Sequence, residues 1–142
     1  MHTLGPRRPR RNERGTAALE FALVVIPLLL ILGGIVNFGM AFSQKLALDN
    51  AVRQAARAAV VDTGTSPTTE AVSSFNGTAI ARQGENVAIT FSGKTTCKGS
   101  IFGERIKVVG TFKSKFMFPW LVPGIPKSMT WTSTGEFQCE YS

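Results

Sequence analysis

The apolar positions of this chain form one long unbroken run before they become periodic. Between Glu20 and Lys45, 24 successive residues carry no charge. As a helix this run would extend about 36 Å, which exceeds the ~30 Å hydrocarbon core of a bilayer. We therefore predict one membrane-spanning segment over residues 21–42.

Helical spacing continues beyond this segment. The apolar positions that follow it are Leu48, Val52, Ala55, Ala56, Ala59 and Val60, while Lys45, Asp49, Arg53 and Arg57 lie mainly on another side. This amphipathic pattern and its alanine content favour helix. We predict a single helix over residues 16–61, with its first half in lipid and its second half against a soluble domain. Turn and breaker residues at 62–67 end it.

The remaining residues, 62–142, are predicted to form a small α+β domain. One to three helical turns are expected within 67–82. Alternating apolar positions then predict strands over 86–92, 105–112 and 129–141. The faces are Val87, Ile89 and Phe91 in the first strand, and Trp131, Gly135, Phe137 and Cys139 in the last. Three or four antiparallel strands packed on the outer half of the long helix are the expected architecture.

An apolar, proline-rich stretch at 116–126 separates the last two predicted strands. It is too short and too interrupted for a second membrane helix. Its aromatic residues Phe116, Phe118 and Trp120 could form an exposed patch that binds a surface or a partner. We expect instead that at least two of the three fill the small core.

Within the predicted span, Pro27 deprives the carbonyl of Leu23 of its usual donor and is expected to kink or loosen the helix. Gly33, Asn37 and Ala41 recur at four-residue spacing. Such a stripe of small or polar residues is suited to close contact with another helix.

The formal charge of +7 is concentrated at the start of the chain. Residues 1–15 hold five arginines and one glutamate, a balance of 5 − 1 = +4, and the remainder holds 11 − 8 = +3. Arginine clusters beside an apolar segment stay in the cytoplasm, which places residues beyond about 45 outside it. The leader contains no aromatic residue on which a base could stack, so nucleic acid is not an expected partner.

Both cysteines, Cys97 and Cys139, lie on the predicted outer side. Neither belongs to a CxxC pair and no histidine is near, so we predict no metal site. The oxidising compartment favours a disulfide, with two free buried thiols as the alternative.

The junction Arg14-Gly15-Thr16-Ala17-Ala18-Leu19-Glu20-Phe21 joins the basic leader to the apolar run. It resembles the prepilin cleavage site of type IV pilin-like proteins. The fuller run RGTAALEFALVVIPLLLILGGIVNFGMAF, continued by ALDNAVRQAARAAV, is similar to the TadE-like minor pseudopilins of tight adherence (Flp pilus) systems. The likeness is good over residues 13–61 and only general afterwards.

The resemblance implies cleavage after Gly15 by an inner-membrane prepilin peptidase, which removes residues 1–15. It implies a pilin-like fold and a bacterial inner-membrane location with a cytoplasmic N-terminus. The protein is then drawn into, or alongside, an extracellular pilus used in adhesion. The implied partners are other pilin or pseudopilin subunits, the inner-membrane pilus assembly machinery and membrane lipid. It implies no cofactor and no enzymatic activity.

The chemistry of the junction agrees with this interpretation. Glycine before the cut leaves room for a peptidase to approach the backbone. Cleavage would expose the amine of Thr16 directly before lipid. A carboxylate in lipid costs about 2.5–3.5 kcal/mol on insertion scales, so Glu20 needs a partner, and the amine of a neighbouring subunit fits. Alternatively, Glu20 reaches the interface or pairs with its own Thr16 amine. Phe21 follows the glutamate, as tyrosine or phenylalanine does in many relatives.

Three other interpretations compete. A secretory signal peptidase could cut after Ala41 and release a domain beginning at Phe42, although the apolar run exceeds the ~7–15 residues of a usual signal core. The chain could be a single-pass anchored binding protein outside any fibre. A tethered enzyme is the third, but the sole histidine is His2 in the leader and no nucleophile elbow, phosphate loop or metal-spaced cluster appears.

Overall fold

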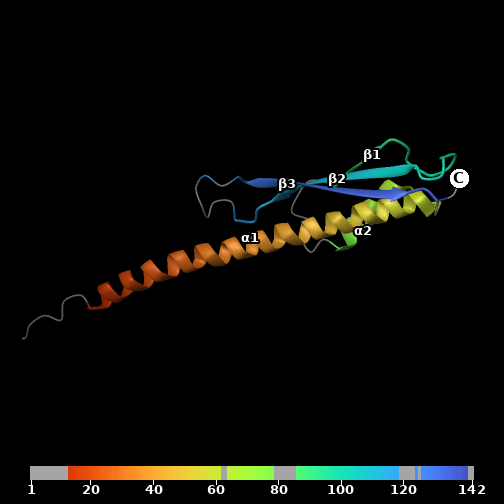
Figure 1. The fold of residues 1–142 in the computed structure, drawn as a ribbon. Coiled ribbons are helices and arrows are strands. Elements are labelled where there is room, and N and C mark those ends of the chain that lie inside the picture. The colour runs from red at the N-terminus through yellow and green to blue at the C-terminus, as the bar shows by residue number, and fades with distance from the viewer. Residues whose placement is uncertain (1–12, 62–63, 79–85, 119–123, 125, 141–142) are drawn as a thin grey trace, which may run out of the picture.

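The computed structural model describes residues 13–61, 64–78, 86–118, 124 and 126–140. These ranges hold the helices α1 (Glu13–Val61) and α2 (Pro67–Thr78) and the strands β1 (Ala88–Ser92), β2 (Arg105–Lys115) and β3 (Ser128–Gln138). Figure 1 shows α1 as a long rod, with the sheet and α2 gathered along its C-terminal half and its N-terminal half projecting beyond the packed layers. The predicted α+β fold with a long N-terminal helix is confirmed.

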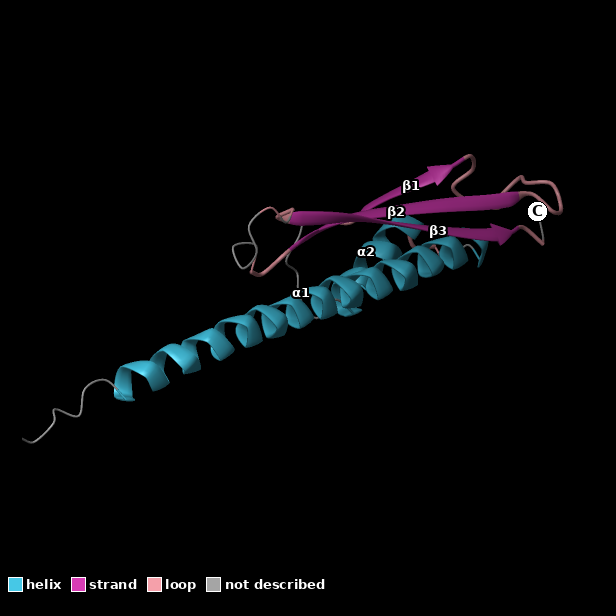
Figure 2. Cartoon of the chain, turned by 60° about the vertical axis from the view of Figure 1, so that its left-hand side comes forward, coloured by secondary structure: helices cyan, strands magenta, loops and turns pink. Residues whose placement is uncertain are grey.

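The three strands form one antiparallel sheet in the order β1-β2-β3. They lie side by side in a single layer over α1 (Figure 2). The β2–β3 ladder runs from Arg105 opposite Gln138 to Lys115 opposite Ser128. The ladder therefore carries β2 three residues beyond the predicted end at Phe112, because each of those residues has a pairing partner on β3.

The C-terminal half of α1 packs on the sheet through Leu48 and Val52, both of which are almost wholly buried. Opposite them the strands carry glycines. A Cβ added to Gly110 would lie 2.5 Å from Cγ2 of Val52, and one added to Gly135 would lie 2.9 Å from Cγ1. The helix and the sheet thus approach more closely than two side-chain layers would allow.

The predicted apolar face of this half is confirmed, since Ala55, Ala56 and Ala59 are fully buried. The second helix, α2, packs against the same half of α1 and also touches β1. It contributes Ala71 and Phe75 to the core. The ring of Phe75 lies 4.7 Å from that of Phe112 on β2, centroid to centroid.

The prediction that at least two aromatic residues of the 116–126 stretch fill the core is wrong. Phe116 and Phe118 are only half-buried and do not belong to the core cluster, and Trp120 lies outside the described residues. The first residues of the stretch lie beside the projecting half of α1, beyond the end of the packed layers, so these two rings do not reach the core.

A disulfide joins Cys97, in the β1–β2 connection, to Cys139, directly after β3. The backbone N–H of Cys97 also donates a hydrogen bond to the carbonyl of Ala59, 3.2 Å away. The connection is therefore fixed both to the last strand and to the end of α1.

Candidate functional site

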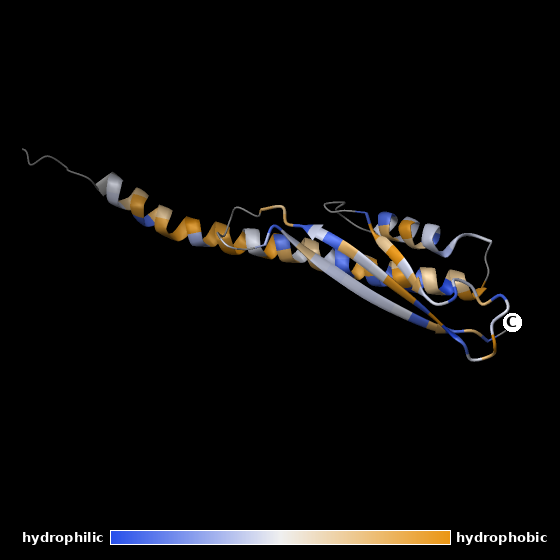
Figure 3. Ribbon diagram, turned by 90° about the horizontal axis from the view of Figure 1, so that it is seen from above, coloured by the Kyte–Doolittle hydropathy of each residue, from blue (hydrophilic) through white to orange (hydrophobic). Residues whose placement is uncertain are grey.

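The projecting half of α1 exposes apolar side chains that a protein in water would bury. Phe21 is 67% and Leu23 68% exposed, and an 18-residue apolar window of this helix has none of its residues buried within the molecule. Figure 3 shows the hydrophobic colour covering this part of the helix on the visible side. By length and composition the helix can cross a membrane once.

The predicted cleavage junction lies at the very start of α1, which begins at Glu13. A Cβ added to Gly15 would meet no atom within 4 Å. Packing within the described chain therefore does not require glycine here, in contrast to Gly110.

Glu20 lies one turn after Thr16 on α1 and is exposed. Among the described residues it makes no hydrogen bond or ion pair. Phe21 follows it, also exposed. The structure thus leaves the Glu20 carboxylate available to a group outside this chain.

Pro27 lies inside α1, and the helix continues through it as one element. The kink expected from the missing amide donor stays a prediction.

Asn37 holds the beginning of the β2–β3 connection against α1. Its Oδ1 accepts hydrogen bonds from the backbone N–H groups of Met117, at 3.0 Å, and Phe118, at 3.1 Å. Its Nδ2 donates to the carbonyl of Phe118, at 3.4 Å. One side chain therefore serves three backbone groups that lie about eighty residues away in the sequence.

The stripe of Gly33, Asn37 and Ala41 faces the chain itself. Ala41 is 2% exposed, and Gly33 borders the same connection as Asn37. The sequence expectation of contact with another helix did not anticipate this arrangement. The available signal was that Asn37 is the first strongly polar side chain after Glu20, since such a group in an apolar run needs a partner.

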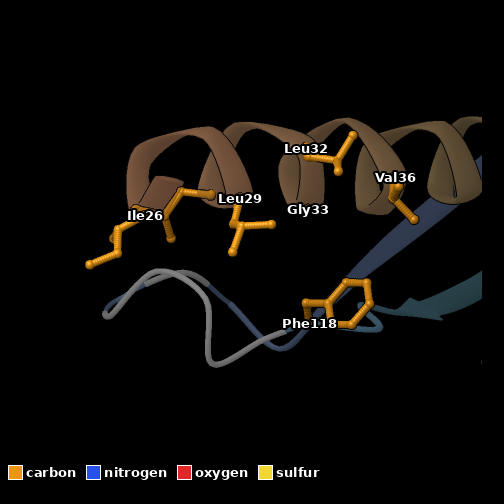
Figure 4. A pocket seen from close by; sticks show the side chains of 7 residues that line it. Ile26, Leu29, Leu32, Gly33, Val36 and Phe118 are labelled. Atoms are coloured by element: carbon orange, nitrogen blue, oxygen red, sulfur yellow. The ribbon is translucent and has the colours of Figure 1, made fainter. Parts of the chain in front are cut away.

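An apolar groove lies between α1 and this connection. It has a volume of about 520 Å³ and is lined by Ile26, Leu29, Leu30, Leu32, Gly33, Val36 and Phe118. Figure 4 shows the Phe118 ring across from the helix surface near Gly33 and Val36.

Further polar contacts lie at the C-terminal end of the apolar run. Lys45 pairs with Asp49 at 2.5 Å and donates to the carbonyl of Thr132. Partial burial would raise the pKa of Asp49, but hydrogen bonds from Lys45 and Ser133 together hold it below its ordinary value. Nearby, the hydroxyl of Ser114 donates to Oε1 of Gln44, and both side chains are buried.

The carboxylates of the outer domain are dispersed in surface contacts. Glu104 pairs with Lys94, and Glu136 with Arg105. Within the described ranges no group of three or more His, Cys, Asp or Glu residues could hold a metal ion.

Comparison with known proteins gives one match. The family model described as TadE-like protein matches residues 15–57, which begin at the glycine of the junction and end within the buried half of α1. This match confirms the resemblance read from the sequence over that stretch. No curated protein and no solved structure matches the chain.

Proposed function

We propose that this chain is a minor pseudopilin of a type IV-like pilus of the Flp, or tight adherence, kind. A prepilin peptidase cuts it after Gly15, and α1 holds it in the bacterial inner membrane with its C-terminal domain outside the cytoplasm. From there it associates with other pilin subunits and the assembly machinery, and acts structurally in pilus assembly and adhesion. The match of residues 15–57 to TadE-like proteins supports the choice of system.

The observation that carries the proposal is the exposed apolar half of α1, joined to a glycine that the fold does not need. A helix with no buried residue in its most apolar window requires lipid or other helices around it. Gly15 has open space at its Cβ position, so its identity is better explained by an enzyme that approaches the backbone. Glu20, unpartnered among the described residues, then meets the new Thr16 amine of a neighbouring subunit.

The fold argues against a secretory cut after Ala41. That bond lies inside α1, and Ala41 and Gln44 are among the most buried residues of the molecule. Cleavage there would also remove Asn37 and its three hydrogen bonds to the β2–β3 connection.

A second function, an anchored binding protein outside any fibre, is favoured by one exposed pair at the far end of the domain. Ile101 is 80% and Phe102 77% exposed, in the β1–β2 connection. Apolar residues this exposed can contact a partner. Such a protein would keep its leader. The N-terminus of the protein from its native host therefore separates the two functions.

The test replaces Gly15 with valine and measures the N-terminus and intact mass of the protein from its native host. We expect the unaltered chain to begin at Thr16 and the Gly15→Val variant to retain all the leader arginines. Gly34→Val is the matched control, because Gly34 lies in the same helix and also has no atom within 4 Å of its Cβ position. It should be processed normally.

Each outcome has a distinct meaning. Processing of Gly15→Val at the same bond would refute the site, and a mature terminus at Phe42 would establish the secretory cut. An unaltered chain that begins at Met1 would refute processing and support the anchored binding protein instead.

A further inference from the structure

We propose that residues 116–118, where the β2–β3 connection begins, enter the outer leaflet of the membrane that α1 crosses, with lipid acyl chains filling the groove beside Phe118. The protein would then contact the bilayer at two places, through its helix and through its sheet domain. This inference rests on the membrane anchoring in the proposed function, but not on processing or on the pilus.

The depth of the hairpin follows from the length of helix that a bilayer needs. Counted from Glu20, a ~30 Å hydrocarbon core takes about 20 residues and ends near Met40. Counted from Thr16, it ends near Val36. Phe118 shares its groove with residues from Ile26 to Val36. Both placements therefore put Phe118 at or below the outer boundary of the hydrocarbon.

Irregular backbone is tolerated at that depth of the bilayer only where its polar groups have protein partners. Asn37 supplies them for the N–H groups of Met117 and Phe118 and for the carbonyl of Phe118. The N–H of Phe116 donates to the carbonyl of Lys127 across the hairpin, at 3.1 Å. The three N–H groups of residues 116–118 and the carbonyl of Phe118 are thus paired.

The charges of the hairpin fit the same depth. Residues 116–126 carry no charge, and the stretch is bounded by Lys115 and Lys127, which are both exposed. Lys115 directly precedes Phe116, and Lys127 lies opposite it across the connection, so both lysines would meet lipid phosphates just above residues 116–118. Met117, between them, is 39% exposed although it is apolar.

The apolar lining of the groove suits lipid acyl chains better than a specifically docked helix. Its lining side chains are all apolar, and Asn37 beside it already uses both its oxygen and its amide on the hairpin. Among the described lining residues no polar side chain is left to fix the register of a docking helix, whereas flexible acyl chains need none.

Tryptophan fluorescence in vesicles with brominated acyl chains tests the proposal on the full chain. In a background with Trp120→Phe and Trp131→Phe, three single tryptophans are introduced: Met117→Trp as the hairpin probe, Leu29→Trp as the anchor probe and Ile101→Trp as the control. Ile101 precedes β2, so it lies about 33 Å along the strand from the hairpin end. We expect M117W to be quenched nearly as strongly as L29W, and several-fold more strongly than I101W.

The outcomes separate this inference from the anchor. If L29W is quenched and M117W behaves like I101W, the hairpin proposal is overturned and the anchor stands. If none is quenched, both are overturned. If M117W is shielded from brominated lipid and also from aqueous acrylamide, a second copy of the chain covers the groove, which overturns lipid as the occupant.

The Asn37→Ala substitution, added to M117W, tests whether Asn37 holds the start of the β2–β3 connection against α1. We expect the quenching of M117W to fall at least several-fold while that of L29W in the same variant is unchanged. Asn50→Ala, at an exposed asparagine further along α1, is the matched control and should alter neither probe. Unchanged quenching of M117W in the Asn37→Ala variant would contradict the role given to that side chain.

Discussion

Two polar residues lie in the apolar half of α1, and only one of them has a partner among the described residues. Asn37 satisfies its amide within the chain, on the backbone of Met117 and Phe118. Glu20 has no such contact among the described residues, and a carboxylate near lipid is costly without one. Asn37 therefore organises the fold of this chain, whereas the Glu20 carboxylate stays available for the contact with a neighbouring subunit that we propose.

Replacing Glu20 with alanine should leave insertion and cleavage intact but weaken association with other pilus subunits. Polar contacts between membrane helices are worth up to about 1.7 kcal/mol, so the association constant should fall by up to about 18-fold. Chemical cross-linking and co-purification from the native host measure it. Glu140→Ala, at an exposed glutamate of the outer domain, serves as the control. Undiminished co-assembly of the Glu20→Ala protein would remove this role from the carboxylate.

At the scale of elements, the contact between α1 and the sheet depends on the two strand glycines. Helical and strand periodicity predict both contacting faces, because 3.6-residue and two-residue repeats are local properties of the sequence. They do not predict how near the two elements lie. Gly110 and Gly135 set that distance, since Val52 occupies the space that a Cβ would need at either position.

Gly110→Ala should therefore destabilise the outer domain by about 1–3 kcal/mol through overpacking against Val52. Urea unfolding of the full chain in detergent, followed by tryptophan fluorescence, measures the change. Gly77→Ala is the control, because its Cβ would meet no atom within 4 Å and alanine favours helix. Combining Gly110→Ala with Val52→Ala should recover part of the loss, and strictly additive effects would show that the two side chains do not collide.

At the scale of the whole molecule, the Cys97–Cys139 disulfide closes the domain onto the end of α1. It joins residues 42 apart in the sequence, and the hydrogen bond from Cys97 to Ala59 extends the tie to the helix. A small domain with part of its chain engaged by the membrane has a limited core, so a cross-link contributes a large share of its stability.

Reduction should lower the free energy of unfolding of the outer domain by about 4 kcal/mol on the chain-entropy model. Urea unfolding with and without dithiothreitol measures it, and intact mass after alkylation counts the free thiols. The Cys97→Ala/Cys139→Ala variant should match the reduced protein and gain nothing further from reductant. Equal unfolding midpoints for the oxidised and reduced chain would contradict this contribution.

The sequence by itself determined the elements and the junction. The 24 uncharged residues, the amphipathic continuation and the alternating strands each depend on neighbouring positions, so they can be read locally. The Gly15 junction is likewise a contiguous motif, and residues 15–57 match a family model.

Only the tertiary structure decided what covers each face. It brought Asn37 to Phe118, left Phe116 and Phe118 outside the core, and set the strand order β1-β2-β3. The physical reason is that periodicity shows which face of an element is apolar but does not specify its partner. That partner depends on contacts between residues far apart in the chain, and on which surfaces stay uncovered once the helix has packed on the sheet.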